Sequence, residues 1–332
     1  MEKSKKIVVL AYEGCMGMEV FGFCDTLLLA NRVAAATRGA AAPPLFDVRV
    51  ASLASGVVRA AGGLSIGTAT YRRSQALLVV PGMDISDRDG CTRPHPQLAA
   101  EVRAIGRAHA GGAPVAGMCV GAFLLAEAGL LDGRRATTSW MFAADLARRF
   151  PLATVEPAAM LVDDGAVITT GAFSAAFDLA MHLIGHSAAP AEARAVGRMA
   201  LLHQRASQAA YIDTDLLARP SGRFADQVRA WLDQHLAEPY VLADLAAAFH
   251  VSARTMLRRL QAESGQTPLG YLQQQRVNLA KRLLDSGTLS VAQITARVGY
   301  NDVATFSTLF KRLTGQSPAQ YRRGFNGDHQ AI

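Results

Sequence analysis

Cys119 is the residue of this 332-residue sequence that is best placed for chemistry. It follows the apolar run Pro114–Met118 and precedes the small-residue stretch Val120–Ala122, a pattern that predicts a buried strand, a sharp turn and a helix. A thiol at that turn would lie at a helix N-terminus, where backbone N–H groups and the dipole favour a thiolate and can bind an oxyanion. The pattern therefore predicts a nucleophile elbow.

Two further groups are expected at the same end of the predicted sheet. The loop Pro81-Gly82-Met83 follows the apolar run Ala76–Val80 and offers free backbone N–H groups, and Glu19 follows the first apolar run, Ile7–Tyr12. The carboxyl ends of parallel strands meet at one edge of a sheet, where small molecules bind. The expected lining of this site is Glu19, Gly82, Met83, Cys119 and Val120.

A second candidate site comes from an internal repeat in the last third of the chain. Gly265-Gln266-Thr267-Pro268 followed by Tyr271 recurs fifty residues later as Gly315-Gln316-Ser317-Pro318 followed by Tyr321. Upstream of each copy, the apolar spacing predicts a short helix, a tight turn and a second helix, with one residue inserted at the second turn, near Gly299. Two copies are too few for a repeat array, so the pattern predicts a duplicated helix-turn-helix.

Each second helix has a face suited to the major groove of DNA. Arg254 and Arg258 lie opposite the apolar residues Met256 and Leu260 in the first copy, and short side chains and Lys311 lie opposite an aromatic face in the second. Arg can read guanine, Thr and Ala can contact a thymine methyl or a phosphate, and Lys neutralises backbone charge. The alternative for one such helix is an ordinary solvated face. The matched pair favours DNA.

The ends of these helices and the helix between them are also predicted. Ser252 is the expected N-cap of the first reading helix, and Asn301 or Asp302 that of the second. Leu269–Leu284 reads as a connecting helix about 24 Å long. With its flanking turns it could hold two reading helices near the ~34 Å separation of successive major grooves.

Length, composition and charge agree with two domains. The chain has 34 Lys and Arg against 27 Asp and Glu, and half of its residues are hydrophobic, which excludes a disordered protein. Residues 221–332 carry 13 of the basic and 8 of the acidic side chains, which indicates a polyanionic partner for that part. The expected domains are 1–204, for ligand sensing and dimerisation, a linker at 205–223, and a DNA-binding domain at 224–325.

The first domain alternates predicted strands and helices. Continuous apolar runs of strand length indicate strands buried on both faces of a mainly parallel sheet. The fold class is therefore α/β, a doubly wound, flavodoxin-like α/β sandwich, followed by an all-α domain with two helix-turn-helix motifs. The predicted strands are Ile7–Tyr12, Phe46–Ser52, Ala76–Val80, Pro114–Met118 and Ala166–Thr170. The predicted helices are Phe21–Thr37, Pro96–Ala110, Gly121–Ala128, Ala175–Ile184 and Ala191–Ala210.

Cysteine and histidine spacing and apolar run length give further expectations. Cys15, Cys24, Cys91 and Cys119 contain no Cys-x-x-Cys pair, so we expect reduced thiols and neither a disulfide framework nor a zinc site. His182 and His186 lack the glutamate of a His-Glu-x-x-His motif, so no metal or other cofactor is expected. No apolar stretch is expected to approach the roughly 20 residues that span a bilayer, which predicts a soluble, cytoplasmic protein without a membrane partner.

Residues 224–323 closely resemble the DNA-binding domain of the AraC/XylS family of transcription regulators. The matching positions are Arg276, Ala280–Leu284, Val298-Gly299-Tyr300, Phe306, Phe310-Lys311 and Tyr321-Arg322. The resemblance implies double-stranded DNA as the partner. The implied DNA contacts are Arg254, Leu257, Arg258, Val303, Ala304, Thr305 and Thr308, to which Lys311 is added as a backbone contact. Arg259 lies on the buried flank and is expected to form a structural ion pair.

Residues 5–187 resemble the ThiJ/PfpI-like superfamily, relatives of class I glutamine amidotransferases. The matching segments include Ala128–Gly133, Ala136-Thr137-Thr138 and Asp163-Asp164-Gly165. Enzymes of that superfamily pair the elbow cysteine with an acidic residue, here Glu19, and often with a histidine, in whose place stands Ser139. A hydroxyl cannot act as a general base at neutral pH, so the resemblance favours a ligand pocket that includes Ser139 over catalysis.

The two resemblances together match the amidotransferase-like subgroup of AraC-family regulators. They imply a homodimer that joins through the first domain and responds to a small metabolite, derived from an amino acid or amine, and they are compatible with contact to RNA polymerase. Two alternatives stay open at this point. One is a thiol enzyme or redox sensor centred on Cys119 and fused to a DNA-binding domain. The other is a constitutive architectural DNA binder.

Overall fold

The chain forms two compact units, Met1–Gln208 and Ala209–Ile332. The computed structural model describes residues 4–39, 41–54, 56–84, 98–202, 205–213 and 224–326. Cys91 and the predicted linker residues 214–223 lie outside the described residues. Each unit has its own hydrophobic core, the first with one and the second with two adjoining clusters of buried side chains.

The first unit is built on an eight-stranded sheet. From one edge to the other the strands are β3 (Gly56–Arg59), β4 (Ser65–Thr70), β2 (Phe46–Ser52), β1 (Lys5–Leu10), β5 (Leu77–Val80), β6 (Val115–Gly117), β10 (Val167–Thr170) and β9 (Leu161–Asp164). Neighbours from β4 to β10 pair in parallel, and only the edge strands β3 and β9 are antiparallel. Strand order reverses beside β1, which makes the carboxyl end of β1 and β5 the switch point of a doubly wound sheet.

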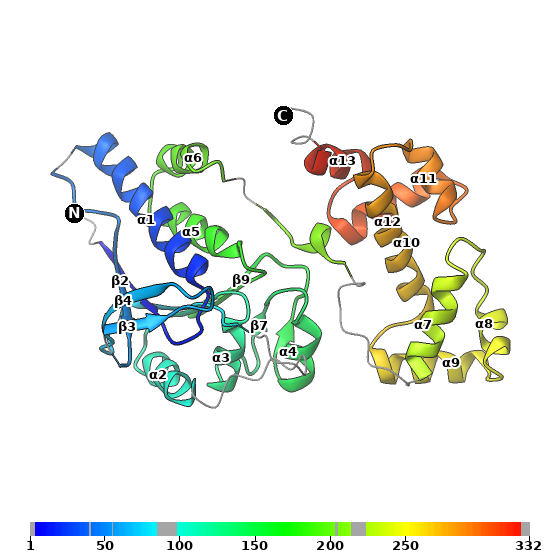
Figure 1. The fold of residues 1–332 in the computed structure, drawn as a ribbon, viewed down its shortest axis with the longest axis horizontal. Coiled ribbons are helices and arrows are strands. Elements are labelled where there is room, and N and C mark those ends of the chain that lie inside the picture. Colours follow the sequence, from blue (N-terminus) through cyan, green and yellow to red (C-terminus); the bar gives the residue numbers. More distant parts are fainter. Residues whose placement is uncertain are drawn as a thin grey trace. The chain divides into compact units, whose positions relative to one another are not determined.

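Helices cover both faces of this sheet (Figure 1). One layer contains α1 (Gly17–Arg38), α5 (Ala175–Gly185) and α6 (Pro190–Met199), and the other contains α2 (Ala99–Ala110) and α3 (Gly121–Glu127). A short helix, α4 (Ala143–Arg149), lies next to the small pair β7 (Arg135–Ala136) and β8 (Thr154–Val155). The predicted α/β sandwich is confirmed.

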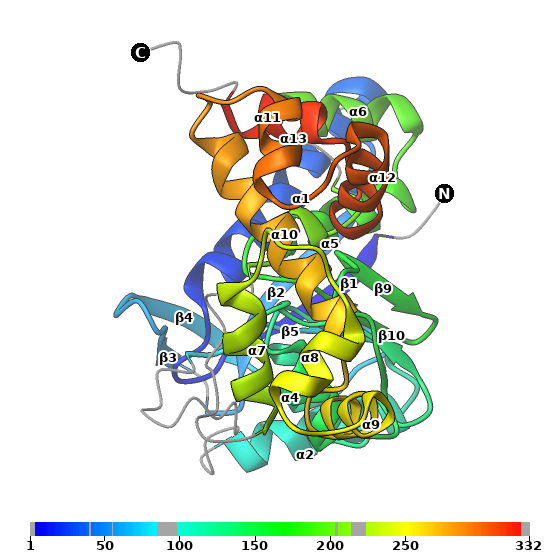
Figure 2. The same cartoon turned by 90° about the vertical axis from the view of Figure 1, so that its right-hand side faces the viewer.

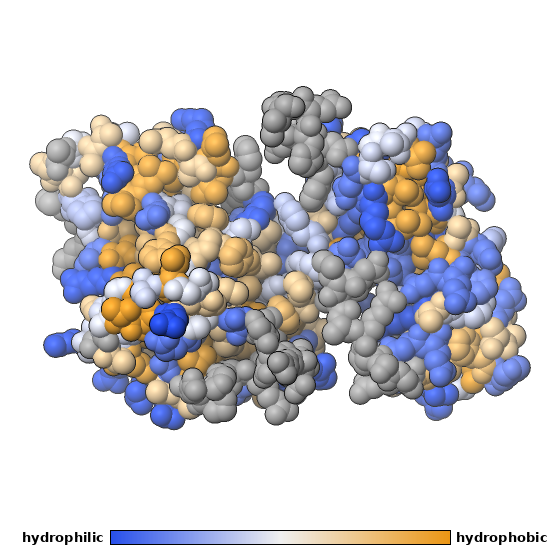
Figure 3. Space-filling model, in the orientation of Figure 1, coloured by the Kyte–Doolittle hydropathy of each residue, from blue (hydrophilic) through white to orange (hydrophobic). Residues whose placement is uncertain are grey.

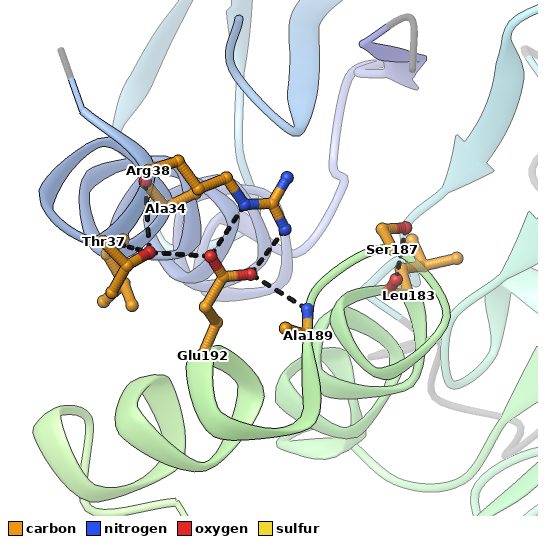
Figure 4. Close-up of polar contacts among 8 residues, drawn as sticks. Ala34, Thr37, Arg38, Leu183, Ser187, Ala189 and Glu192 are labelled. Carbon is orange, nitrogen blue, oxygen red and sulfur yellow. Dashed lines mark hydrogen bonds and ion pairs between the residues drawn. The ribbon is translucent and has the colours of Figure 1, made fainter. Parts of the chain in front are cut away.

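A buried carboxylate ties α1 to α6 (Figure 4). Glu192 accepts hydrogen bonds from Arg38 Nε at 2.7 Å, from Thr37 Oγ1 at 2.7 Å and from the Ala189 N–H at 2.9 Å. The hydrogen bond from Arg38, together with those from Thr37 and Ala189, lowers the pKa of Glu192 to about 2. The ion pair fixes the last turn of α1 against the first turn of α6.

The expectation about apolar stretches is wrong for α1. This helix has 22 residues and is long and apolar enough to cross a membrane by length and composition. Val20, Phe23, Leu27 and Ala30 are nevertheless buried in the core of the first unit. Polar residues such as Asp25 interrupt α1, but they do not lower the mean hydropathy of the helix enough to exclude a membrane span by composition.

The helix predicted for residues 191–210 is also wrong in its second half. The α6 helix ends at Met199, and Leu201 adopts a left-handed conformation with φ of +52°, which a continuing helix cannot contain. Ser207 then pairs with Ala159 in a short β-bridge. An alanine-rich composition favours helix in isolation, but tertiary hydrogen bonds outweigh that preference here.

The described residues of the second unit form helices and turns and no strand. Its elements are the 3₁₀ turn η2 (Ala209–Tyr211), α7 (Phe224–Gln234), α8 (Leu242–Ala248), α9 (Ala253–Ser264), α10 (Pro268–Asp285), α11 (Val291–Arg297), α12 (Val303–Thr314) and α13 (Pro318–Asn326). Figures 1 and 2 show α10 running from the group α7–α9 to the group α11–α13. The predicted connecting helix and the two helix-turn-helix copies are confirmed.

Candidate functional site

The elbow forms where β6 meets α3. Cys119 has φ of +50°, a conformation uncommon for residues other than glycine. The turn brings Gly121 so close to the end of β5 that a Cβ there would lie 2.6 Å from the carbonyl oxygen of Val80. Only glycine allows this approach, so the elbow packs directly against the loop Pro81-Gly82-Met83.

Glu19 lies beneath that loop at the start of α1. It is fully buried, and the Gly82 N–H donates to its Oε2 at 2.6 Å. The Gly82 N–H is therefore not free, contrary to the sequence-based expectation, because a buried carboxylate takes up nearby donors. Burial raises the pKa of Glu19 to about 7, against the opposing effects of the Gly82 N–H and the Cys119 thiol. Oε1 has no hydrogen-bond partner among the described residues.

Burial favours the neutral Cys119 thiol over the thiolate that a helix N-terminus would favour. Desolvation, followed by the nearby charge of Glu19, raises the pKa of Cys119 to about 12, although backbone groups of Phe173 and Val120 oppose the shift. The dipole of α3, a helix of seven residues, does not offset these two effects. Near neutral pH, Glu19 can therefore gain or lose a proton while the Cys119 thiol stays protonated. The thiol is not an activated nucleophile.

The other predicted site residues lie around this pair. Val120 and Met83 are buried, and a Cβ on Gly82 would be 3.3 Å from Val120. Ser139 is buried as well, and it follows Thr138, whose hydroxyl donates to the carbonyl of Cys119 at 2.8 Å. The structure thus brings Glu19, Gly82, Cys119 and Val120 together, with Ser139 in the adjoining loop.

Sequence reasoning missed Gln208. It lies in the segment predicted as helix and linker, yet its side chain is buried and hydrogen-bonded to the loop that contains Thr138. A lone glutamine in an alanine-rich stretch carries no pattern that distinguishes it from a solvated residue. Only the hydrogen bonds of the folded chain identify it.

The two reading helices, α9 and α12, have the same length and the same kind of capping at both ends. The Ser252 hydroxyl accepts from the Thr255 N–H in the first copy, and the Asp302 carboxylate accepts from the Thr305 N–H in the second, so Asp302 is the second predicted cap. Both helices have 12 residues and end at glycines with positive φ. The extra residue of the second turn is present, because α8 and α9 are separated by one residue fewer than α11 and α12.

The predicted DNA contacts all lie on exposed faces. Arg254, Leu257 and Arg258 are exposed along one side of α9, with Leu257 37 % exposed. Val303, at 40 %, is exposed at the start of α12. The remaining predicted contacts, also exposed, are Ala304, Thr305, Thr308 and Lys311. Arg259 is also exposed, contrary to the expected buried flank, but it forms the expected ion pair, with Glu263 at 3.9 Å, and covers the ring of Phe224.

Arg276 connects the two copies from within α10. Its Nε donates to the carbonyl of Leu236 at 2.8 Å, and its guanidinium lies over the ring of Tyr300, 5.0 Å from the centroid. A Cβ on Gly299 would meet the same guanidinium at 2.9 Å. Arg276 is buried and touches the chain after α7 as well as the second turn, so it bridges the two copies.

Comparisons with known proteins find a match for each of the two units. Residues 5–186 match the DJ-1/PfpI family, and residues 245–324 match a helix-turn-helix domain. The HTH-type transcriptional regulator CdhR of Pseudomonas aeruginosa is 28 % identical over 321 residues, which cover 92 % of this chain and 89 % of that protein. The HTH-type transcriptional regulator GlxA of Rhizobium meliloti is 28 % identical over 287 residues, which cover 84 % and 86 %.

One solved structure is similar to part of the chain. The crystal structure of an AraC family transcriptional regulator from Pseudomonas putida is 21 % identical, covers 59 % of this chain and 99 % of that chain, and has a TM-score of 0.48. The family match extends over more than half of the sequence and includes the elbow. The chain therefore belongs to the DJ-1/PfpI family and carries an AraC-type helix-turn-helix domain after it, the architecture of a DNA-binding transcriptional regulator.

Proposed function

We propose that this protein is a cytoplasmic transcription regulator whose DNA binding responds to a small amine- or amino-acid-derived metabolite held at the elbow. The observation that carries the proposal is the buried Oε1 of Glu19, which lacks a partner among the described residues. An unpartnered buried acceptor costs about 1–3 kcal/mol, and a ligand N–H would remove that cost. A cationic amine would also stabilise the carboxylate form of Glu19.

Catalysis is not part of this proposal. Ser139 stands where a histidine base is expected, and the Cys119 thiol is neutral at physiological pH. A neutral thiol without a histidine base is a poor nucleophile. We expect no amidase or glyoxalase-type turnover from the purified protein.

The experiment starts with in vitro selection of DNA sites by the purified chain. Affinity for the selected duplex is then measured by fluorescence anisotropy with and without a panel of amino acids and quaternary amines. We expect at least one compound to change the affinity, and Glu19→Gln to abolish that response while basal DNA binding persists. The response should strengthen as pH rises through about 7, because Glu19 then becomes ionised.

Cys119→Ala separates this proposal from a thiol-based sensor. The variant keeps Glu19 and should keep the response to the amine. Loss of the response in Cys119→Ala, together with a change of DNA affinity on peroxide treatment of the wild type, would instead assign the function to the thiol. Identical affinity under all these conditions would indicate a constitutive DNA binder.

We also propose that α1 forms the surface through which two chains dimerise. Phe21 and Leu28 are 42 % and 46 % exposed, and their spacing of seven places them on one side of the helix. Figure 3 shows hydrophobic residues gathered over the part of the first unit that contains α1. Phe21→Glu with Leu28→Glu should shift sedimentation from dimer to monomer, whereas the control Leu152→Glu, at a residue that is also exposed, should not.

A further inference from the structure

Residues Arg205–Ile212, called the junction segment below, contain the boundary between the two units. The boundary falls between Gln208 and Ala209, so two consecutive residues belong to different units. Each half of the segment makes its own set of hydrogen bonds inside its own unit.

The first half is bonded to the loops that surround the elbow. The side-chain Oε1 of Gln208 accepts from the N–H groups of Trp140 and Ala172, at 3.3 and 3.2 Å. Its Nε2 donates to the carbonyls of Thr138 and Ala159, at 2.8 and 3.1 Å. A single buried amide therefore satisfies four backbone groups from three loops.

These loops contact the elbow itself. The Thr138 hydroxyl donates to the carbonyl of Cys119, and the backbone of Phe173 interacts with the Cys119 thiol. Arg205 adds a second attachment, because its guanidinium donates to the carbonyl of Ser174 at 3.0 Å and to Asp178. A change in the position of the elbow loops must therefore break or reorient bonds made by the junction segment.

The second half is bonded to the centre of the helical unit. Lys281, on α10, donates from Nζ to the carbonyls of Ala209 and Ile212, at 3.2 and 2.7 Å. Ala210 is buried in the core that contains Phe310 of α12, and η2 contacts α12. The segment is thus seated against the connecting helix and the second reading helix together.

We propose that Gln208 and Lys281 form the coupling between the elbow and the DNA-reading unit. A ligand that displaces the loops bonded to Gln208 pulls on Ala209 through one peptide bond and alters the seat of residues 209–212 on α10 and α12. The inference rests on the proposed function for its ligand, but the coupling itself is a property of the free protein. Coupling free energies are reciprocal, so a change at Lys281 must alter the local stability of the elbow loops.

The test is hydrogen exchange on the full-length protein without ligand or DNA. Gln208→Met approximately keeps the side-chain volume and removes all of the side-chain hydrogen bonds of Gln208, and Lys281→Met removes two. We expect Lys281→Met to accelerate exchange of the Trp140 and Ala172 amides about fivefold or more, and Gln208→Met to do the same for amides of α12 around Phe310. Gln208→Glu, which retains the acceptor oxygens, serves as the second variant should Gln208→Met not fold.

Two matched controls weaken each unit away from the junction segment. Glu192→Gln loses bonds between α1 and α6, and Tyr271→Phe loses its bonds to Asp233. Each control should change exchange only within its own unit. The coupling is refuted if Lys281→Met and Gln208→Met behave like the controls. If the coupling is present but no amine alters DNA affinity, the proposed effector is wrong and the inference stands.

Discussion

The helices of the two helix-turn-helix copies have the same lengths, but their large side chains are distributed in opposite ways. In α9 the buried residues are Met256 and Leu260, and long basic side chains lie on the exposed face. In α12 the buried residues include Phe306, Leu309 and Phe310, and most of the side chains on the exposed face are short. Where α9 has Arg259, fifty residues later α12 has Leu309. The first copy therefore carries more charge on its exposed face, and the second copy has the larger apolar core.

This difference predicts two modes of DNA contact. Short side chains such as Ala304 and Thr308 require the backbone of α12 to approach the bases closely, and a rigid aromatic core supports that approach. Arg254 and Arg258 can reach bases or phosphates from a greater distance. The second copy should therefore be sensitive to changes in packing, and the first to changes in charge.

Core truncation should show the largest difference. Phe310→Ala should reduce the free energy of unfolding of the second unit by about 3–5 kcal/mol, because a fully buried ring is lost. Leu260→Ala should cost less, toward the lower end of the range of about 2–5 kcal/mol for a buried leucine, because a smaller side chain is lost. Urea unfolding followed by Trp231 fluorescence, in a Trp140→Phe background, measures both. An equal or greater cost for Leu260→Ala would contradict the comparison.

Charge removal should affect the first copy more in DNA binding. Arg254→Ala and Arg258→Ala should each weaken specific binding by about 1–3 kcal/mol if they read bases. Lys311→Ala should weaken binding to all sequences alike and reduce the slope of log affinity against log salt by about one. Anisotropy titrations at several salt concentrations separate these outcomes. A uniform loss for Arg254→Ala would reclassify it as a phosphate contact.

Removal of the helix caps should have a smaller effect. Ser252→Ala should destabilise the second unit by roughly 1 kcal/mol, because the Thr255 N–H loses its acceptor. Asp302→Ala should also destabilise it, and there the effect depends on pH. Hydrogen bonds from Thr305 lower the pKa of Asp302, so the wild-type cap is intact at neutral pH and weakens as pH falls below the ordinary range of aspartate. Thermal unfolding at pH 7 and pH 3 compares the two caps.

A pH-dependent difference concerns Lys281, whose ammonium donates to residues 209 and 212 beside the second copy. Burial lowers the pKa of Lys281 to about 8, against 10.5 for free lysine. Above pH 8 the folded chain loses this proton before the unfolded chain does, so stability should rise with pH. Between pH 7.5 and 9.5 the wild type should gain stability relative to Lys281→Met. Tyr321, whose pKa is raised by burial, is present in both chains, so the comparison with Lys281→Met cancels its contribution.

Much of the architecture could be read from local patterns. Five buried strands, the elbow at Cys119 and both caps depend on residues that are close together in sequence. The strands β3, β4 and β9 were missed because they lie at or near the sheet edges, are partly exposed and have no continuous apolar run. The end of α6 was missed because the bonds that hold residues 205–208 come from loops more than 25 residues away in the chain.

The sequence by itself determined that the chain has an α/β unit with an elbow and a duplicated DNA-reading unit, because periodicity and repeats are local properties. The tertiary structure decided the chemical state of the elbow, since burial around Glu19 and Cys119 sets which of them carries the proton. It also decided the role of Gln208. Desolvation and long-range hydrogen bonds depend on which residues meet in space, and no spacing along the chain specifies them.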